Sequence, residues 1–290
     1  MKEVVVISGK GGTGKTTFSA SLAPFLGRAV LADCDVDAPN LRILLDPREE
    51  AAEDFVGTRK AAADPSLCDG CGLCVERCRF EALSLSGSGG PPAVAAHRCE
   101  GCGVCAYVCP RGAMTLEDTV VGTLTRGITD YGPMVGARLI PGEETSGKLV
   151  TAVRKEAAAA AAREGIDFVL VDGSPGIGCS VISSLTNAHR AVIVTEPSVS
   201  ALHDLERLHD LLGRFRIPAV AVVNRCDISD EMTHRIERFC ADRGIPVGMK
   251  LPFSRDVVEA VSARRIPSLA LPEFFREHGF EAFVDDLIGG

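Results

Sequence analysis

The sequence has no apolar run long enough to cross a membrane. Its longest runs, residues 157–162 and 219–223, are far shorter than the roughly 20 residues that span a bilayer. The apolar residues near the N-terminus, 4–7, are too few for the core of an export signal, and Gly9 and Lys10 interrupt them. We therefore expect a cytoplasmic protein.

Basic residues are also in short supply. Lys and Arg number 31 against 39 Asp and Glu, which gives a formal net charge of -8. This is the wrong sign for a surface that grips nucleic-acid phosphates or anionic lipids, so nucleic acid is not an expected partner. The composition, with 46% hydrophobic and 24% charged residues, excludes disorder and a collagen-like chain. A length of 290 residues predicts about two domains.

Cysteine, in contrast, is abundant: the chain has twelve. In a reducing cytoplasm, grouped cysteines are more often metal ligands or redox centres than disulfides. Eight of them form two runs that each read C-x-x-C-x-x-C-x-x-x-C. The runs are Cys68, Cys71, Cys74 and Cys78, then Cys99, Cys102, Cys105 and Cys109.

This spacing is typical of iron-sulfur ligation. Zinc sites usually combine two C-x-x-C pairs across a longer loop, whereas three thiolates at two-residue gaps can bind three irons of a cubane. The fourth cysteine of each run lies too far along to close its own cluster, so it ligates the other one. We expect two 4Fe-4S clusters, one held by Cys68, Cys71, Cys74 and Cys109, the other by Cys99, Cys102, Cys105 and Cys78. A pair of zinc knuckles is the alternative.

Residues 64–117 resemble a two-cluster bacterial-type ferredoxin in both of these runs. Pro110 follows the last cysteine, as that family's pattern has it, whereas Arg79 follows Cys78, where the family usually has proline. The difference bears on the stiffness of the loop and on solvent access, and it leaves the ligand itself in place.

The N-terminal region contains a phosphate-binding pattern. A β-branched apolar stretch, 4–7, leads directly into G-K-G-G-T-G-K-T-T, which matches G-x-x-x-x-G-K-[ST]. Glycines let successive amides converge on a β-phosphate, Lys15 reaches the β- and γ-phosphates, and Thr16 ligates Mg²⁺. We expect a nucleoside triphosphate site made by Gly9, Gly11, Gly12, Thr13, Gly14, Lys15, Thr16 and Thr17.

An additional lysine, Lys10, makes this segment similar to the deviant Walker A motif of the MinD/Mrp/nitrogenase-iron-protein group of P-loop ATPases. The resemblance implies ATP as the nucleotide and a homodimer in which Lys10 reaches the partner's phosphates. The alternative interpretation of Lys10 is a solvated loop lysine.

Two further segments resemble the switches of that family. Residues 33–40 are similar to switch I, which implies that Asp35 positions the attacking water and that Asp33 holds the Mg²⁺ shell. Residues 167–172 resemble a Walker B strand, in which Asp172 binds the metal through water, and residues 173–178 resemble switch II.

A third segment, residues 224–227, is similar to the family's base-reading strand end. The resemblance implies that Asn224 contacts adenine and that Pro252 belongs to the second wall of the base site.

Strand patterns alternate with helical ones along the rest of the chain, which predicts an α/β fold with a doubly wound, mostly parallel sheet. We expect helices at 15–26, 149–163, 202–215, 230–243, 255–263 and 273–287, and a hairpin of 120–129 with 134–140. The expected division is a P-loop ATPase domain in two parts (1–60 and 149–290), an inserted ferredoxin domain (61–117) and a hairpin or hinge connector (118–148).

Two features of the second half of the chain are less specific. Cys179 follows residues 176–178 near an expected helix N-terminus, where it is either a small buried residue or a thiol that reaches a metal or a partner. The amphipathic stretch 273–287 lacks the basic face of MinD's membrane anchor, so we expect no membrane anchor.

These features predict an iron-sulfur ATPase. One hypothesis is a homodimeric ATPase whose hydrolysis of Mg-ATP controls electron transfer through two 4Fe-4S clusters to a redox protein. The alternative is a carrier that assembles or delivers a cluster to a metalloprotein client, as Mrp-type ATPases do. Against the carrier, residues 149–290 contain no C-x-x-C pair.

Overall fold

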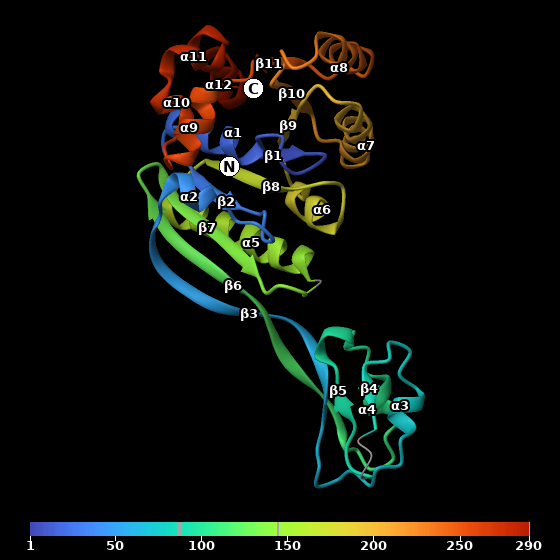
Figure 1. Cartoon of the computed structure of the whole chain (residues 1–290). Coiled ribbons are helices and arrows are strands. Elements are labelled where there is room, and N and C mark those ends of the chain that lie inside the picture. Colours follow the sequence, from blue (N-terminus) through green and yellow to red (C-terminus); the bar gives the residue numbers. More distant parts are fainter. Residues whose placement is uncertain (86–88, 144, 290) are drawn as a thin grey trace. The chain divides into compact units, whose positions relative to one another are not determined.

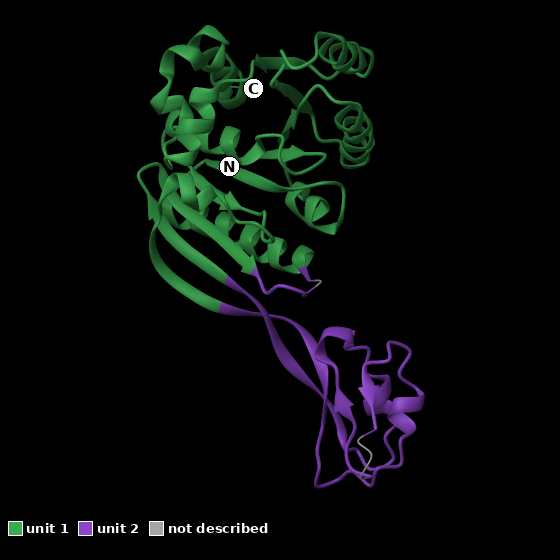
Figure 2. Cartoon of the chain, viewed as in Figure 1, with its two compact units in different colours: residues 1–53, 124–138, 146–290 green, residues 54–123, 139–145 purple. Residues whose placement is uncertain are grey.

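The computed structural model describes residues 1–85, 89–143 and 145–289. The chain forms two compact units (Figure 2), of which unit 1 contains residues 1–53, 124–138 and 146–290 and unit 2 contains residues 54–123 and 139–145. The phosphate-binding motif lies in unit 1, and both cysteine runs lie in unit 2.

A nine-stranded sheet forms the centre of unit 1 (Figure 1), and it is parallel from β11 through to β7. The expected α/β fold with a mostly parallel sheet is therefore confirmed. In spatial order the strands are β11 (Val247–Leu251), β10 (Ala219–Asn224), β9 (Arg190–Thr195), β1 (Lys2–Ser8), β8 (Phe168–Pro175), β2 (Val30–Asp33), β7 (Gly132–Leu139), β6 (Met114–Thr129) and β3 (Arg48–Ala63).

Helices cover both faces of this sheet, with α6–α8 on one side and α9–α12 on the other (Figure 1). The helices of unit 1 are α1 (Lys15–Leu22), η1 (Ala23–Phe25), α2 (Leu41–Leu45), α5 (Ser146–Glu164), α6 (Cys179–Leu185), α7 (Val199–Phe215), α8 (Asp230–Asp242), α9 (Arg255–Ser262), α10 (Pro267–Ala270), α11 (Pro272–Glu277) and α12 (Phe280–Gly289).

The expectation of one helix over 273–287 is wrong, because α11 and α12 are separate. Gly279 adopts φ 78° between them, a left-handed conformation that glycine takes without strain and that ends a helix. The break turns Phe280 and Phe283 of α12 into the core, where they are 1% and 4% exposed.

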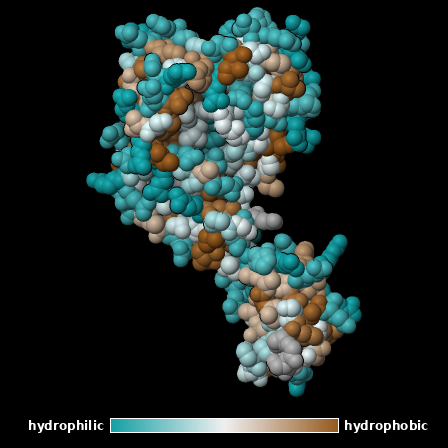
Figure 3. All heavy atoms as spheres, viewed as in Figure 1, coloured by the Kyte–Doolittle hydropathy of each residue, from teal (hydrophilic) through white to brown (hydrophobic). Residues whose placement is uncertain are grey.

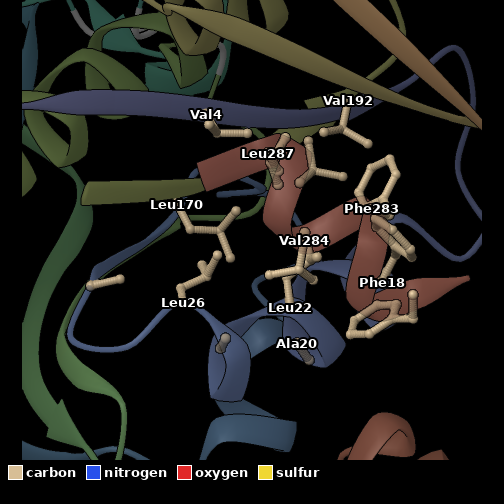
Figure 4. Packing of buried hydrophobic residues seen from close by; sticks show 14 of the residues in the cluster. Val4, Phe18, Ala20, Leu22, Leu26, Leu170, Val192, Phe283, Val284 and Leu287 are labelled. Atoms are coloured by element: carbon tan, nitrogen blue, oxygen red, sulfur yellow. The ribbon is translucent and has the colours of Figure 1, made fainter. Parts of the chain in front are cut away.

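The hydrophobic core fixes the helix that follows the phosphate-binding loop (Figure 4). Phe18 of α1 makes edge-to-face contacts with Phe280 and Phe283, with ring centroids 6.1 and 5.6 Å apart. Such a pair contributes about 0.5–1.5 kcal/mol beyond its buried area. The C-terminal helix therefore holds α1, and with it the loop, in place.

The expected hairpin is present, but it belongs to the central sheet rather than to a separate connector. Only Asp130 and Tyr131 separate β6 from β7, and β7 pairs in parallel with β2, with Gly136 opposite Asp33. The residues expected to form the connector, 118–148, therefore divide: 124–138 and 146–148 belong to unit 1, whereas 118–123 and 139–145 belong to unit 2. Sequence analysis also did not predict β3, whose pairing partner β6 is far away in the sequence.

Unit 2 is built from two similar halves. Each half has a short helix, α3 (Leu73–Glu76) or α4 (Val104–Val108), directly after a glycine with positive φ. A small core of Ala61, Cys74, Leu83, Cys105 and Met114 packs between the halves. The unit also contains η2 (Ala96–Arg98) and an antiparallel pair of β4 (Leu83–Ser84) with β5 (Ala93–Val94).

On the faces drawn in Figure 3, hydrophobic side chains are interspersed with hydrophilic ones. Within the described ranges, none of the helices combines the length and apolar character needed to span a bilayer.

Candidate functional site

The phosphate-binding loop of unit 1 connects β1 to α1 and borders a cavity. This cavity is lined by Ser8, Gly11, Gly12, Gly14, Lys15, Thr16, Thr17, Asp35, Asp37, Ala38, Asn40, Ile43, Leu44, Ser174, Pro175, Ser180, Arg225 and Val261. It thus brings together the phosphate-binding loop and residues of the segments 33–40 and 173–178. Gly9 does not line the cavity; a Cβ there would lie 2.1 Å from Cβ of Asp204 on α7, so Gly9 permits a close approach of that helix.

The carboxylate of Asp172 is the centre of a buried polar network at the bottom of this cavity. Its side chain is fully buried. It accepts hydrogen bonds from Thr16 Oγ1 and Ser19 Oγ, both at 2.7 Å, and Lys15 Nζ lies 2.9 Å from Oδ1. Lysine, hydroxyl and carboxylate in this arrangement are the groups that P-loop proteins use for phosphate and Mg²⁺.

Two more aspartates place negative charge beside Asp172. Asp33 is 1% exposed and accepts hydrogen bonds from the amides of Asp35 and Leu41, each at 3.2 Å. Burial, together with the nearby charge of Asp172, raises the pKa of Asp33 well above its usual range. Burial also raises the pKa of Asp35, although Lys15 opposes this shift.

Lys15 compensates part of this charge. Burial disfavours its ammonium, but the charges of Asp172 and Asp35 outweigh that effect and raise the pKa of Lys15 above its usual value. The Lys15 Nζ to Asp35 Oδ2 distance is 3.7 Å. The site therefore holds three carboxylates around one buried cation, an arrangement that favours the binding of a further cation such as Mg²⁺.

A second, more apolar cavity adjoins the first. The two share Gly14, Thr17, Arg225 and Val261. The second is also lined by Phe18, Ser21, Val194, Asn224, Leu251, Pro252, Phe253, Ser254, Val257, Val258, Ser262, Phe274 and Phe275. The first cavity is called the phosphate cavity. The position of the second cavity next to it and the apolar walls of the second cavity suit a nucleobase, so the second is called the base cavity.

Asn224 lines this second cavity, but both ends of its amide already have partners inside the chain. Its Nδ2 donates to the carbonyl oxygen of Thr13 at 2.8 Å, and its Oδ1 accepts from the amide of Arg225 at 3.1 Å. Asn224 thus ties the base cavity to the phosphate-binding loop. Its expected contact with adenine stays a prediction.

Lys10 points away from the phosphate cavity of its own chain. Its Nζ lies 2.8 Å from Glu196 Oε1 and donates to Ser198 Oγ and Ser200 Oγ at 3.1 and 3.0 Å. Glu196 also accepts from Arg225 Nη1 at 2.9 Å. The side chain of Lys10 remains 32% exposed, so it is accessible to a partner molecule.

In unit 2, a cavity is lined by Cys68, Cys71, Cys74 and Cys109. These are the four residues that the sequence assigns to one cluster, including the cysteine from the second run. Burial raises the pKa of Cys74, and the neighbouring thiols Cys109 and Cys68 raise it further. Around Cys105, where burial again raises the pKa, the neighbouring thiols are Cys99 and Cys102.

Backbone amides point at three of the cysteine sulfurs. The amide of Ala61 donates to Sγ of Cys99, that of Ala82 to Sγ of Cys78, and that of Ala113 to Sγ of Cys109, each at 3.3 Å. Such donors stabilise a thiolate and tune the potential of an iron-sulfur cluster.

Two glycines allow the tight turns between the ligands. A Cβ at Gly70 would lie 2.3 Å from the carbonyl oxygen of Gly89, and one at Gly101 would lie 2.1 Å from that of Arg59. Both residues have positive φ, 73° and 62°, so the same backbone geometry recurs in the two runs.

Among residues 1–85, 89–143 and 145–289, no group of three or more His, Cys, Asp or Glu side chains converges closely enough to hold one metal ion. The clusters therefore stay a prediction. In a 4Fe-4S cluster each cysteine binds a different iron, so its ligands need not converge on one atom.

The amino-acid sequence matches the CobQ/CobB/MinD/ParA nucleotide-binding domain over residues 4–267. The chain belongs to the CobQ/CobB/MinD/ParA family. This match covers the phosphate-binding loop and the segments 33–40 and 173–178, whereas Phe274 and Phe275 of the second cavity lie beyond it.

Two relatives come from Methanocaldococcus jannaschii, and both are uncharacterized proteins. One is 33% identical over 226 residues, which cover 77% of this chain and 78% of the relative. The other is 28% identical over 264 residues, covering 89% of this chain and 88% of the relative.

Solved structures of MinD share the fold. The MinD of Pyrococcus horikoshii, complexed with Mg-ADP, superposes with a TM-score of 0.60 at 18% identity and covers 99% of this chain and 95% of its own. The cell-division ATPase MinD of Pyrococcus furiosus gives a TM-score of 0.56 at 21% identity, covering 98% and 95%.

Sequence analysis did not predict Ser19 or Glu196 at this site. Ser19 is four residues after Lys15 on α1, so helical periodicity was the signal that could have placed it near Asp172. Glu196 follows a strand end, where chemistry collects in α/β folds, but it belongs to no motif. Ser174 lies in the segment 173–178 that resembles switch II, but the sequence did not identify its partner.

Proposed function

We propose that this protein is a homodimeric iron-sulfur ATPase in which hydrolysis of Mg-ATP controls electron transfer through two 4Fe-4S clusters to a protein partner. The observation that carries the proposal is the presence, in one chain, of a phosphate cavity bordered by both switches and of a cavity lined by cysteines from both runs.

The nucleotide part of the proposal assigns a task to five polar side chains in or next to the phosphate cavity. Lys15 and the loop amides would bind the phosphates. Thr16 and Asp33 would belong to the shell of a bound Mg²⁺, and Asp172 would contact that shell through water. Asp35 lines the cavity, and its proposed task is to orient the attacking water.

The homodimer rests on Lys10. Its ammonium is held by exposed and half-buried partners on its own chain, and such a surface ion pair is worth only about 0–1 kcal/mol. A partner's phosphates, with their higher charge, can therefore draw Lys10 out of this position.

The cysteines of unit 2 fit two 4Fe-4S clusters. Cys68, Cys71, Cys74 and Cys109 would hold one and Cys99, Cys102, Cys105 and Cys78 the other, with amide donors already aimed at Cys78, Cys99 and Cys109. Each cluster, when bound, supplies a one-electron redox centre. The surrounding chain would position the thiolates, of which Cys74 and Cys105 are buried and Cys71 and Cys102 are exposed.

Two measurements on anaerobically purified protein test these parts separately. Iron and acid-labile sulfide analysis should give about eight of each per chain, the content of two 4Fe-4S clusters. Lys10→Ala should abolish ATP hydrolysis while nucleotide binding is retained. Unchanged turnover in this variant would remove the dimer-coupled mechanism, and about one zinc per cysteine run would remove the clusters.

The carrier hypothesis makes a different prediction for the same protein. Cluster transfer to an apo-acceptor would support it, whereas clusters that stay bound through repeated redox cycles support electron transfer.

A further inference from the structure

Ser174 connects switch II to switch I through one buried hydrogen bond. Its Oγ donates to the carbonyl oxygen of Cys34 at 2.6 Å. Ser174 is 2% exposed and Cys34 is 0% exposed. Cys34 directly precedes Asp35, so this bond holds the Cys34–Asp35 peptide group.

This side-chain hydrogen bond takes the place of a backbone hydrogen bond that would continue the pairing of β8 with the segment after β2. The amide of Cys34 donates to the carbonyl of Asp172 at 2.8 Å, and in a continued parallel ladder the amide of Ser174 would next donate to the carbonyl of Cys34. Instead that amide lies 3.4 Å from Ser184 Oγ, and the hydroxyl of Ser174 takes its place.

A β-bulge explains this exchange. Along its other edge β8 pairs with β1, where Asp172 lies opposite Val6 and Pro175 lies opposite Ser8. Between these two pairs β8 therefore contains one residue more than β1. Such an extra residue disrupts the ladder and re-aims a side chain, often next to an active site. Without the hydroxyl of Ser174, the buried carbonyl of Cys34 would lose this donor.

We propose that Ser174 is a positioning residue for ATP hydrolysis: by holding the Cys34 carbonyl, it sets the orientation of Asp35 in the phosphate cavity. This inference rests on the proposed role of Asp35. Ser174 itself also lines the cavity, so the same hydroxyl joins the position of switch II to that of the water-orienting carboxylate.

The test compares Ser174→Ala with Ser268→Ala in the full-length protein. Ser268 is a matched control, because it is equally buried and its Oγ donates to the carbonyl of Ser21 at 2.8 Å, between α10 and α1. Ser174→Ala should lower kcat about tenfold and leave KM for ATP within about twofold, since it misplaces a group that acts in the transition state. Ser268→Ala should leave both constants unchanged, and Ser174→Thr, which keeps the hydroxyl, should recover most of kcat.

A double-mutant cycle shows whether Ser174 acts through Asp35. In an Asp35→Asn background, Ser174→Ala should cause no further loss, because the group that it positions is already gone. Wild-type protein without any ATPase activity would refute the proposed function itself. If the wild-type protein is active, three results would overturn the role of Ser174. They are a kcat of Ser174→Ala equal to that of wild type, a loss of kcat in Ser268→Ala as large as that in Ser174→Ala, or additive losses when Ser174→Ala is combined with Asp35→Asn.

Discussion

The two lysines of the phosphate-binding motif should differ sharply in what they contribute to stability. Lys15 is 5% exposed and its ammonium lies 2.9 Å from the fully buried Asp172. Lys15→Met keeps most of the volume but leaves Asp172 without its cation, and removing one partner of a buried pair costs about 3–5 kcal/mol. Lys10→Met, the matched control, breaks a pair with Glu196 that is 32% and 18% exposed and should cost about 0–1 kcal/mol.

Urea unfolding at neutral pH measures both losses, with no nucleotide present. The folded-state pKa of Lys15 is raised above its usual value. Its stabilising contribution is therefore fully present below the unfolded-state pKa of about 10.4 and disappears only as the pH rises through the folded-state value. A measurement near pH 7 thus captures the whole effect.

The loss caused by Lys15→Met should shrink on acidification. Burial raises the pKa values of Asp33 and Asp35, so these carboxyls take up protons above the usual range of an aspartate. Protonation of Asp33 and Asp35 relieves their repulsion with Asp172, which the missing ammonium of Lys15 no longer compensates in the variant. Equal losses for the two lysine variants, or a loss in Lys15→Met that grows as the pH falls, would refute this reasoning.

Three other predictions follow from the same contacts. Cys71→Ser combined with Cys109→Ser should remove one cluster and leave about four irons per chain, because both residues belong to the same proposed cluster, with iron analysis and electron paramagnetic resonance as the measurements; loss of both clusters would contradict the crossed assignment. The raised pKa of Asp35 should make kcat fall on acidification at a pH above the usual aspartate pKa of about 3.9, because the ionised form orients water. The same fall of kcat with pH in Asp35→Asn would contradict this. Gly14→Ala should weaken nucleotide binding at least tenfold, since Gly14 has φ 93° and a Cβ would lie 2.4 Å from Asn224 Nδ2; titration calorimetry would detect unchanged affinity if the loop tolerates it.

Sequence alone predicted the parts of this protein in which chemistry is encoded locally. The glycines and Lys15 of the phosphate-binding loop identify a nucleotide-binding segment, because the ligand itself dictates their spacing. The doubled cysteine spacing predicts a second site on the same ground, and the clusters that it would hold stay a prediction. The parallel strands were predicted for a similar reason, since a strand buried on both faces is apolar throughout.

The contacts that sequence missed join distant segments. Strand β3 is exposed along much of its length, so it lacks the apolar pattern of a buried strand, and its pairing with β6 depends on the whole sheet. The hydrogen bond from Ser174 to Cys34 depends on a bulge whose register is set by β1. The local sequence contains no sign of either partner.

The central claim is that nucleotide binding in unit 1 controls redox chemistry in unit 2. An anaerobic redox titration of the full-length protein, with and without Mg-ATP, tests it most directly. We predict two low-potential clusters whose midpoint potential or rate of oxidation changes when Mg-ATP is added, and no change in Lys15→Met, because that variant lacks the lysine that contacts the phosphates. Clusters whose potentials and oxidation rates are the same with and without Mg-ATP in the wild-type protein would contradict the account.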